Sequence, residues 1–212
     1  MQHSKIKRKK TRQISVGNVK IGGDAPIRVQ SMTNTPTPDV TATVTQIQRL
    51  QEAGCEIVRV AVPDQEAAKA VAVIKNRIDI PLIADIHFDY RLAIAAAKAG
   101  ADGLRINPGN IGPLKKVKAV VDCAKDHNIP IRIGVNSGSL EKDILKKFNG
   151  VTAAGMVESG LRHVELLQSL DFDQIKISLK ASDVHRTLEA YRLLSTKTNL
   201  PLHVGVTEAG AL

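Results

Sequence analysis

The chain has 212 residues, of which 43% are hydrophobic and 24% are charged, so we expect one folded domain with a large apolar core. No apolar run is long enough to cross a membrane, and no apolar segment follows the basic N-terminus. We therefore expect a cytoplasmic protein without a secretory signal. Aromatic residues make up 2% of the chain, which argues against the stacking platforms that bind single-stranded nucleic acid.

The net charge of +9 is concentrated at the N-terminus. Six of the 30 basic residues lie within residues 1–12, which contain no acid, so the remaining chain holds 24 basic and 21 acidic residues. We expect residues 1–12 to form a solvated, disordered tail. Cys55 and Cys123 do not form a C-x-x-C pair, and we expect both to be small buried hydrophobic residues rather than metal ligands or a disulfide.

The elements follow in a regular order. Residues 13–23 predict a β-hairpin, because two β-branched runs flank the turn pair Gly17-Asn18. The rest of the chain, 24–212, alternates strand and helix patterns. Strands are predicted at 26–32, 56–62, 81–85, 102–106, 130–135, 174–179 and 201–206. Helices are predicted at 40–53, 64–76, up to 100, up to 127, 140–147, 152–169 and up to 195, with Asp39, Ser139 and either Ser182 or Asp183 as N-caps.

Strands that alternate with helices indicate βα units and a parallel sheet. A doubly wound open sheet and a barrel both fit, but no G-x-G-x-x-G turn follows the first strand, which weakens a dinucleotide-binding fold. Seven repeats favour an α/β fold of the TIM (β/α)8-barrel type. The sequence ends just past the seventh strand, so we expect a barrel truncated after strand seven. Its first and last strands should then face a gap, with apolar inner residues such as Val29 and Val204 uncovered.

Polar residues recur in the predicted strands, although strands of a parallel sheet are buried on both faces. The candidates are Arg28, Arg59, Asp85, His87, Arg105, Asn107, Arg132, Asn136, Lys176, Ser178, Lys180 and His203, with Glu208 just beyond the last strand. Polar residues within one strand share parity and therefore a face. A buried unpaired guanidinium is too unfavourable to be incidental, so the set predicts one wet cavity at the C-terminal mouth of the barrel.

The cations at this mouth predict an anionic ligand, and phosphate in particular, because the arginine fork donates two hydrogen bonds at once. Gly134 leaves room for a ligand or another backbone between Arg132 and Asn136. The loop at 105–112 adds backbone amides near the same place, where glycines permit close approach. We expect one or two of the cations, Lys176 first, to pair instead with helix carboxylates outside the barrel.

Five segments in order resemble the bacterial 4-hydroxy-3-methylbut-2-en-1-yl diphosphate synthases, iron–sulfur enzymes of the methylerythritol phosphate route to isoprenoids. They are VQSMTN (29–34), ADIHF (84–88), LRINPGNIG (104–112), RIGVNSGS (132–139) and VTEAG (206–210). The resemblance implies a TIM barrel followed by a domain that holds a [4Fe–4S] cluster on three cysteines and a glutamate. It also implies a homodimer in which the cluster domain of one subunit caps the barrel of the other.

For the reaction, the resemblance implies two-electron reduction and ring opening of 2-C-methyl-D-erythritol 2,4-cyclodiphosphate, with flavodoxin or ferredoxin as electron donor. Carried onto matching positions, the diphosphate-binding residues are Arg59, Arg105, Arg132, Asn136 and Lys180. Asp85 and His87 then line the pocket, and Glu208 is the expected proton donor. Asn107 is a further binding candidate, followed by Arg28, Ser178 and His203.

This chain departs from the family pattern, because the final strand and the cluster domain are absent from it. We therefore expect no cluster ligands, no colour and no reductase activity from these 212 residues alone. One alternative is another phosphate-binding barrel enzyme resembling the pterin-binding synthases. The other is a nucleic-acid binder that works through residues 5–12, which the scarce aromatics and the arginines within strands disfavour.

Overall fold

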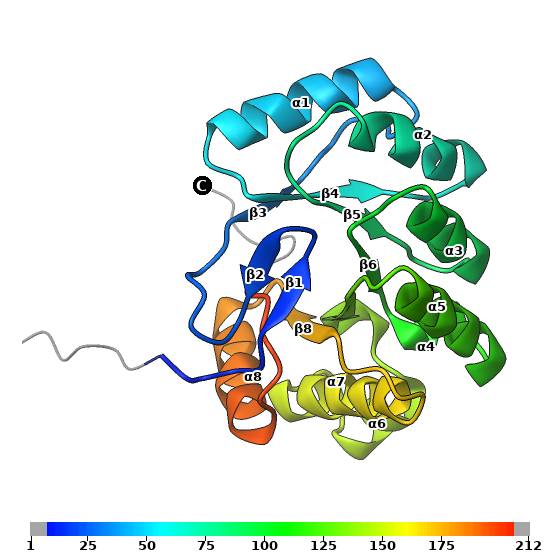
Figure 1. The fold of residues 1–212 in the computed structure, drawn as a ribbon. Helices are drawn as coiled ribbons and strands as arrows, with labels where there is room; N and C mark the ends of the chain where they lie inside the picture. Colours follow the sequence, from blue (N-terminus) through cyan, green and yellow to red (C-terminus); the bar gives the residue numbers. More distant parts are fainter. Residues whose placement is uncertain (1–7, 206–212) are drawn as a thin grey trace, which may run out of the picture.

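A parallel sheet forms the centre of the structure, a computed structural model that describes residues 8–205. Its six strands follow one another in chain order and are β3 (Gln30–Met32), β4 (Ile57–Ala61), β5 (Leu82–Asp85), β6 (Gly103–Ile106), β7 (Ile131–Asn136) and β8 (Ile175–Lys180). Figure 1 shows the sheet curving into an arc with its helices on the outside. The arrangement confirms the predicted α/β fold, an incomplete barrel of the TIM type.

Helices connect each strand to the next. They are α1 (Val40–Glu52), α2 (Gln65–Lys75), α3 (Tyr90–Lys98), α4 (Pro108–Ile111), α5 (Leu114–Asp126), α6 (Lys142–Lys147), α7 (Ala153–Gln168) and α8 (Val184–Lys197). Several begin at an aspartate whose carboxylate accepts a hydrogen bond from a first-turn amide, as Asp39 does for α1 and Asp183 for α8. Ser139 was a wrong prediction. Its hydroxyl donates to the Asn136 carbonyl within a 3-10 turn, and α6 starts three residues later without a side-chain cap.

The two faces of the sheet have different neighbours. One set of alternating positions, for example Val58, Val60 and Ile133, packs against the helices in the main apolar core. The other set faces the inside of the arc. At the start of the strands, Ile57 and Ile83 of this inner set pack against Val16 of the hairpin.

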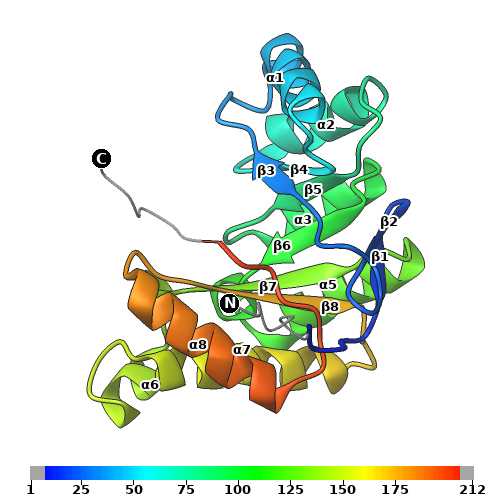
Figure 2. The ribbon, with the colours of Figure 1, turned by 90° about the vertical axis from the view of Figure 1, so that its left-hand side faces the viewer.

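The hairpin closes the inside of the arc at that end. It consists of β1 (Ile14–Val16) and β2 (Val19–Ile21), as predicted for residues 13–23. Figure 2 shows it beside the end of the sheet at which the strands begin. The inner space is therefore floored by apolar residues and opens toward the carboxyl ends of the strands.

Within the described residues 201–205, the predicted seventh strand is reduced to one bridging residue. Leu202 pairs with Ile177 of β8, and the backbone ladder continues only to the His203 amide, which donates to the Ile177 carbonyl at 2.8 Å. The next rung would join Leu179 to His203. Instead, the Tyr191 hydroxyl of α8 accepts from the Leu179 amide at 3.0 Å and donates to the His203 carbonyl. A side chain thus replaces the rung, and regular pairing ends there.

Apolar side chains are uncovered along both borders of the arc, as expected for an open barrel. Ile27 and Val29 are 82% and 56% exposed before β3, and Val204 is 70% exposed on the other border. β3 is also shorter than predicted, because the Val29 amide donates to the Glu56 carboxylate rather than to a strand. By register, Gln30 and Met32 pair with the inward residues Ile57 and Arg59, so these two, and not Val29, occupy inner positions of β3.

Residues 8–12 correct the predicted tail of residues 1–12. The Arg12 amide donates to the Asn199 carbonyl at 2.6 Å, and the Arg12 guanidinium pairs with Asp173 at 2.8 Å. Lys9 donates to carbonyls at the end of α8. This segment therefore lies against the barrel, which weakens its proposed use as a nucleic-acid arm. No helix within residues 8–205 is both long and apolar enough to cross a bilayer.

Candidate anion-binding site

A row of charged residues crosses the inner face of the sheet. Asp85 pairs in register with Arg105, Arg105 with Arg132, and Arg132 with Lys176, on the four neighbouring strands β5 to β8. Paired positions of parallel strands point to the same face. The register therefore gathers these side chains inside the arc, as the two-residue period of the sequence predicted.

Asp85 is the centre of the ion pairs in this row. Its Oδ1 lies 3.1 Å from Arg105 Nη1 and 3.6 Å from His87 Nε2, and its Oδ2 lies 3.4 Å from Arg59 Nε. Burial alone would raise its pKa, but the His87 hydrogen bond and the charges of Arg105 and Arg59 lower the pKa of Asp85 to about 2. The carboxylate is therefore ionised, and it is shared by two guanidinium groups.

Arg59 has a second neighbour that the sequence analysis did not identify. Its Nε and Nη2 contact the Met32 sulfur at 3.2 and 2.9 Å. The two residues pair in register on β3 and β4, so parity could have placed Met32 beneath the guanidinium. Thioether sulfur is a weak acceptor, which leaves Arg59 able to bind a stronger one.

Arg132 is the most unusual side chain of the site. It is 1% exposed, and its Nε, Nη1 and Nη2 atoms all lack a hydrogen-bond partner. Burial, together with the charges of Arg59 and Arg105, lowers the pKa of Arg132 to about 9. Buried charges are ordinarily paired, so five unused N–H donors inside the barrel indicate a place for an anion.

Gly134 makes room for Arg105 rather than for another backbone. A Cβ at Gly134 would lie 2.7 Å from Arg105 Nη2 and 2.8 Å from Cζ. Arg105 Nη2 also donates to the Gly134 carbonyl at 3.4 Å, while Arg105 Nε has no partner. The absence of a side chain at Gly134 thus lets the guanidinium lie close against β7.

Two lysines of β8 add positive charge to the inner face. Burial and the charges of Arg132 and Arg59 lower the pKa of Lys176 to about 7. Burial and the same arginines lower the pKa of Lys180 to about 8. We expected Lys176 to pair with a helix carboxylate outside the barrel, and this was wrong. Lys176 is 3% exposed, lies on the inner face, and forms no ion pair within residues 8–205.

Other predicted residues lie around this group and differ in their exposure to solvent. His87 is at the mouth with a 58% exposed side chain, and Asn136 pairs in register with Lys180. His203 is half-buried, and its partial burial with the charges of Arg132 and Lys176 lowers its pKa to about 2, so it is a neutral neighbour of the cations.

Asn107 and Ser178 already have structural partners. The Asn107 Oδ1 accepts from the Gly109 amide at 3.1 Å as the N-cap of α4, and the Ser178 hydroxyl donates to the Ile133 carbonyl. The Gly109 amide is therefore occupied, so this part of the 105–112 loop does not offer a free donor in the structure.

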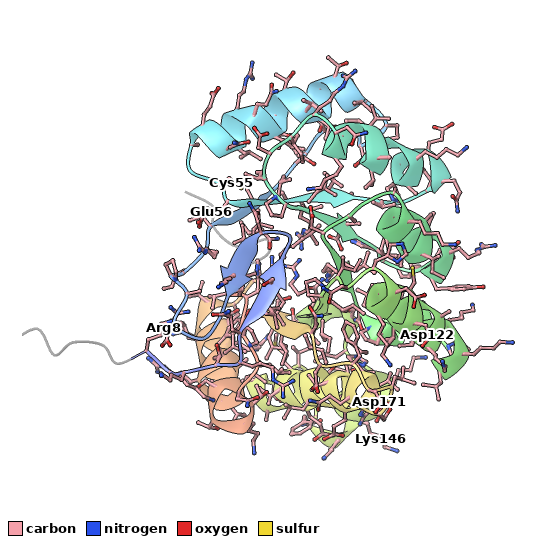
Figure 3. The ribbon with its side chains drawn as sticks, viewed as in Figure 1. Arg8, Cys55, Glu56, Asp122, Lys146 and Asp171 are labelled. Carbon is pink, nitrogen blue, oxygen red and sulfur yellow. The ribbon has the colours of Figure 1, made fainter. Side chains whose placement is uncertain are left out.

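Arg28 stands apart from the site, and its candidacy is corrected. Its guanidinium pairs with Glu56 at 2.5 Å and donates to the Lys20 carbonyl of the hairpin. Figure 3 labels Glu56 next to Cys55, at the entry to β4. This is the floor of the barrel and not its mouth. Glu208 lies outside the described residues.

The site has far more positive than negative charge. Arg59, Arg105, Arg132, Lys176 and Lys180 share the inner face, and Asp85 is the only carboxylate that forms an ion pair with any of them within residues 8–205. Such a group can bind a ligand with several negative charges. The ligand's charge would offset both the mutual repulsion of the cations and the loss of their hydration on burial.

The described residues do not fit a metal cluster. No group of three or more histidine, cysteine, aspartate and glutamate side chains is arranged to hold a metal within residues 8–205. Cys55 is buried and its thiol contacts the Ile57 carbonyl, while Cys123 is buried in α5 beside Ile94. Neither belongs to the inner face.

Comparison with known proteins gives one family and several curated relatives. The family model described as the GcpE TIM-barrel domain matches residues 11–212. The 4-hydroxy-3-methylbut-2-en-1-yl diphosphate synthase (flavodoxin) of Pseudomonas putida strain F1 is 62% identical over 209 residues, covering 99% of this chain and 57% of that protein. The enzyme of the same name from Alcanivorax borkumensis strain SK2 is 59% identical, covering 97% and 55%. The chain thus spans a little over half the length of these relatives.

Solved structures of low sequence identity share the fold. Dihydropteroate synthase of Xanthomonas albilineans has a TM-score of 0.61 at 16% identity, covering 91% of this chain and 76% of that chain. The 3-dehydroquinate dehydratase of Geobacillus kaustophilus has a TM-score of 0.63 at 13% identity, covering 90% and 77%. These two similarities support the barrel architecture alone.

Proposed function

Because the chain belongs to the GcpE TIM-barrel domain family, we propose that it is the substrate-binding barrel of a cytoplasmic 4-hydroxy-3-methylbut-2-en-1-yl diphosphate synthase. Its ligand is 2-C-methyl-D-erythritol 2,4-cyclodiphosphate, which the complete enzyme reduces and opens to 4-hydroxy-3-methylbut-2-enyl diphosphate in isoprenoid biosynthesis. The observation that carries this proposal is the unpartnered guanidinium of Arg132, buried among other cations.

The diphosphate is held by the inner face of β4 to β8. Arg132 and Arg105 donate to phosphate oxygens with nitrogens that have no protein partner, and Arg59 exchanges its thioether contact for an anionic oxygen. Lys180 and Asn136, paired at the ends of their strands, bind from the mouth side. Asp85 holds Arg59 and Arg105 in place and, with His87, lines the pocket.

The reductive step requires groups that the described residues do not supply. In the family that the sequence resembles, a [4Fe–4S] cluster supplies two electrons to the bound substrate, and the names of the curated relatives specify flavodoxin. The described residues hold no group that fits such a cluster. The cluster domain, the flavodoxin donor and the homodimer belong to the proposal for the complete protein.

Glu208 is proposed to donate a proton to the departing oxygen in the complete enzyme. Replacing it by Gln keeps the size of the side chain and removes the acid. We expect Glu208→Gln to bind the cyclic diphosphate normally and to turn it over far more slowly. Turnover at the parent rate, measured by product formation in a reduced assay, would exclude this role.

Titration calorimetry of the protein with the cyclic diphosphate tests the proposal. Arg132→Ala should weaken binding severely, whereas Arg28→Ala is the matched control, because Arg28 pairs with Glu56 at the floor of the barrel. If the wild-type protein fails to bind the cyclic diphosphate, or binds a pterin diphosphate instead, the proposed function is wrong.

A further inference from the structure

A buried polar cluster of Glu141, Ser159 and His163 lies next to the loops that follow β6 and β7. His163 and Ser159 are buried on α7, one turn apart, and both face Glu141. The Ser159 hydroxyl donates to Glu141 Oε2 at 2.8 Å, and His163 Nε2 lies 2.9 Å from Glu141 Oε1. Glu141 stands at the start of α6, immediately after the loop that leaves β7 through Asn136. These two contacts therefore join α7 to the loop that follows β7.

The same imidazole also contacts the loop that leaves β6. A Cβ at Gly109 would lie 3.3 Å from His163 Cε1 and 3.4 Å from Asn107 Oδ1, so the ring packs directly against the backbone of the α4 turn. Asn107 caps that turn through the Gly109 amide. One histidine of α7 thus touches the two loops that follow the strands of Arg105 and Arg132.

The Glu141–His163 pair is poorly explained as a source of stability. His163 Nε2 and Glu141 Oε1 approach to 2.9 Å, and neither atom has another hydrogen-bond partner. Burial lowers the pKa of His163 despite the opposing charge of Glu141, so burial disfavours the charged imidazolium that an ion pair would need. Apolar side chains of similar volume would fill this space at least as favourably.

We propose that Glu141 and His163 are positioning residues for the diphosphate site, which set the β6 and β7 loops at the distance that the ligand requires. This inference rests on the proposed function. The Glu141–His163 pair holds both loops to one helix, α7. It thereby fixes the positions of the ends of β6, which carries Arg105, and β7, which carries Arg132 and Asn136. Its role is geometric and not stabilising.

Binding and stability of the complete protein separate these roles. We compare wild type, Glu141→Met, His163→Leu and the double variant by calorimetric titration with 2-C-methyl-D-erythritol 2,4-cyclodiphosphate and by thermal melting. The expected result is a Kd about 10-fold weaker in the double variant, with a melting temperature within a few degrees of wild type. Glu141→Gln, which keeps the side-chain size, should weaken binding less. It carries the test if the double variant does not fold.

Asp143→Asn is the matched control. It breaks the exposed Arg162–Asp143 pair of 2.7 Å, which joins α7 and α6 without touching either loop, and should leave the Kd unchanged. A folded double variant that binds with the wild-type Kd would overturn the inference while leaving the proposed function intact. Absence of binding by the wild type itself would overturn both, and the two failures are thereby distinguished.

Discussion

Arg132 illustrates at the level of one residue what the proposed ligand would compensate. Its guanidinium is fully buried and has no hydrogen-bond partner, and burial together with the neighbouring cations lowers its pKa to about 9. A buried charge in this state destabilises the ligand-free fold. An anion would compensate this charge, so the proposed role of Arg132 is to bind the ligand at the expense of stability.

Arg132→Met should therefore have opposite effects on stability and binding. The ligand-free variant should melt at a higher temperature than wild type, because an apolar side chain of similar length replaces an unpaired charge. Binding of the cyclic diphosphate should weaken by about 2–4 kcal/mol, or roughly 30- to 700-fold, as for a lost charge-assisted bidentate contact. Thermal melting and calorimetry measure the two effects. A variant that melts lower and binds normally would show that Arg132 is structural.

Asp85→Asn tests whether Asp85 acts by position or by charge. The substitution removes the negative charge at the centre of the cations, and on charge alone anion binding should become tighter. However, Asp85 holds Arg105 at 3.1 Å and Arg59 at 3.4 Å. Because both guanidinium groups would lose their anchor, we expect weaker binding, on the order of 10-fold. Tighter binding in the titration would refute the anchoring role.

β7 shows at the level of an element how a strand shapes the site through a missing side chain. Gly134→Ala would place a methyl group against the Arg105 guanidinium, with contacts of 2.7 and 2.8 Å that the flexible arginine must relieve. We expect a folded protein in which Arg105 is displaced and the cyclic diphosphate binds at least several-fold more weakly. Gly138→Ala is the control on the same segment, because a Cβ there meets nothing within 4 Å. Equal affinities of the two variants would contradict this reading of β7.

Local patterns predicted the elements well where local chemistry decides them. The side chains of Asp39 and Asp183 do cap α1 and α8, and two-residue periodicity did place Arg105 and Arg132 on one inner face. The prediction of a full seventh strand was wrong because the hydroxyl of Tyr191, on the preceding helix, replaces the backbone hydrogen bond between Leu179 and His203. The predicted ion pair of Lys176 was wrong because the two-residue period indicates the face of the strand on which a residue lies but not the residues that it contacts. The proposed role of His163 depends on the contact of α7 with two loops distant in sequence, which residue spacing does not reveal.

At the scale of the whole molecule, the excess of buried cations makes stability depend on pH. The pKa of Lys176 is about 7 and that of Lys180 about 8 in the folded state, both below the ordinary lysine value of 10.5. At pH values between each folded-state pKa and 10.5, the unfolded chain binds more protons than the folded chain. The stability of the ligand-free protein should therefore rise from pH 7 to pH 9 and fall as pH drops through 8 and 7.

Melting curves of the ligand-free protein between pH 7 and 9 check this sign. Lys176→Met should raise the melting temperature at pH 7 and flatten the slope, because it removes the more strongly shifted group. Saturating cyclic diphosphate should also reduce the slope, since the anion restores the protonated lysines. A melting temperature that falls steadily from pH 7 to 9 in the wild type would contradict the burial of uncompensated cations.

Calorimetric titration of the protein with 2-C-methyl-D-erythritol 2,4-cyclodiphosphate at pH 8, repeated in buffers of different ionisation enthalpy, tests the central claim most directly. The ligand carries no group that titrates near this pH, so any proton exchanged belongs to the protein. Since Lys180 and Lys176 titrate at about 8 and 7, ligand binding should take up roughly one proton. Binding that takes up a proton would support a diphosphate site built from buried cations. Absence of binding, or binding whose heat is the same in every buffer, would contradict it.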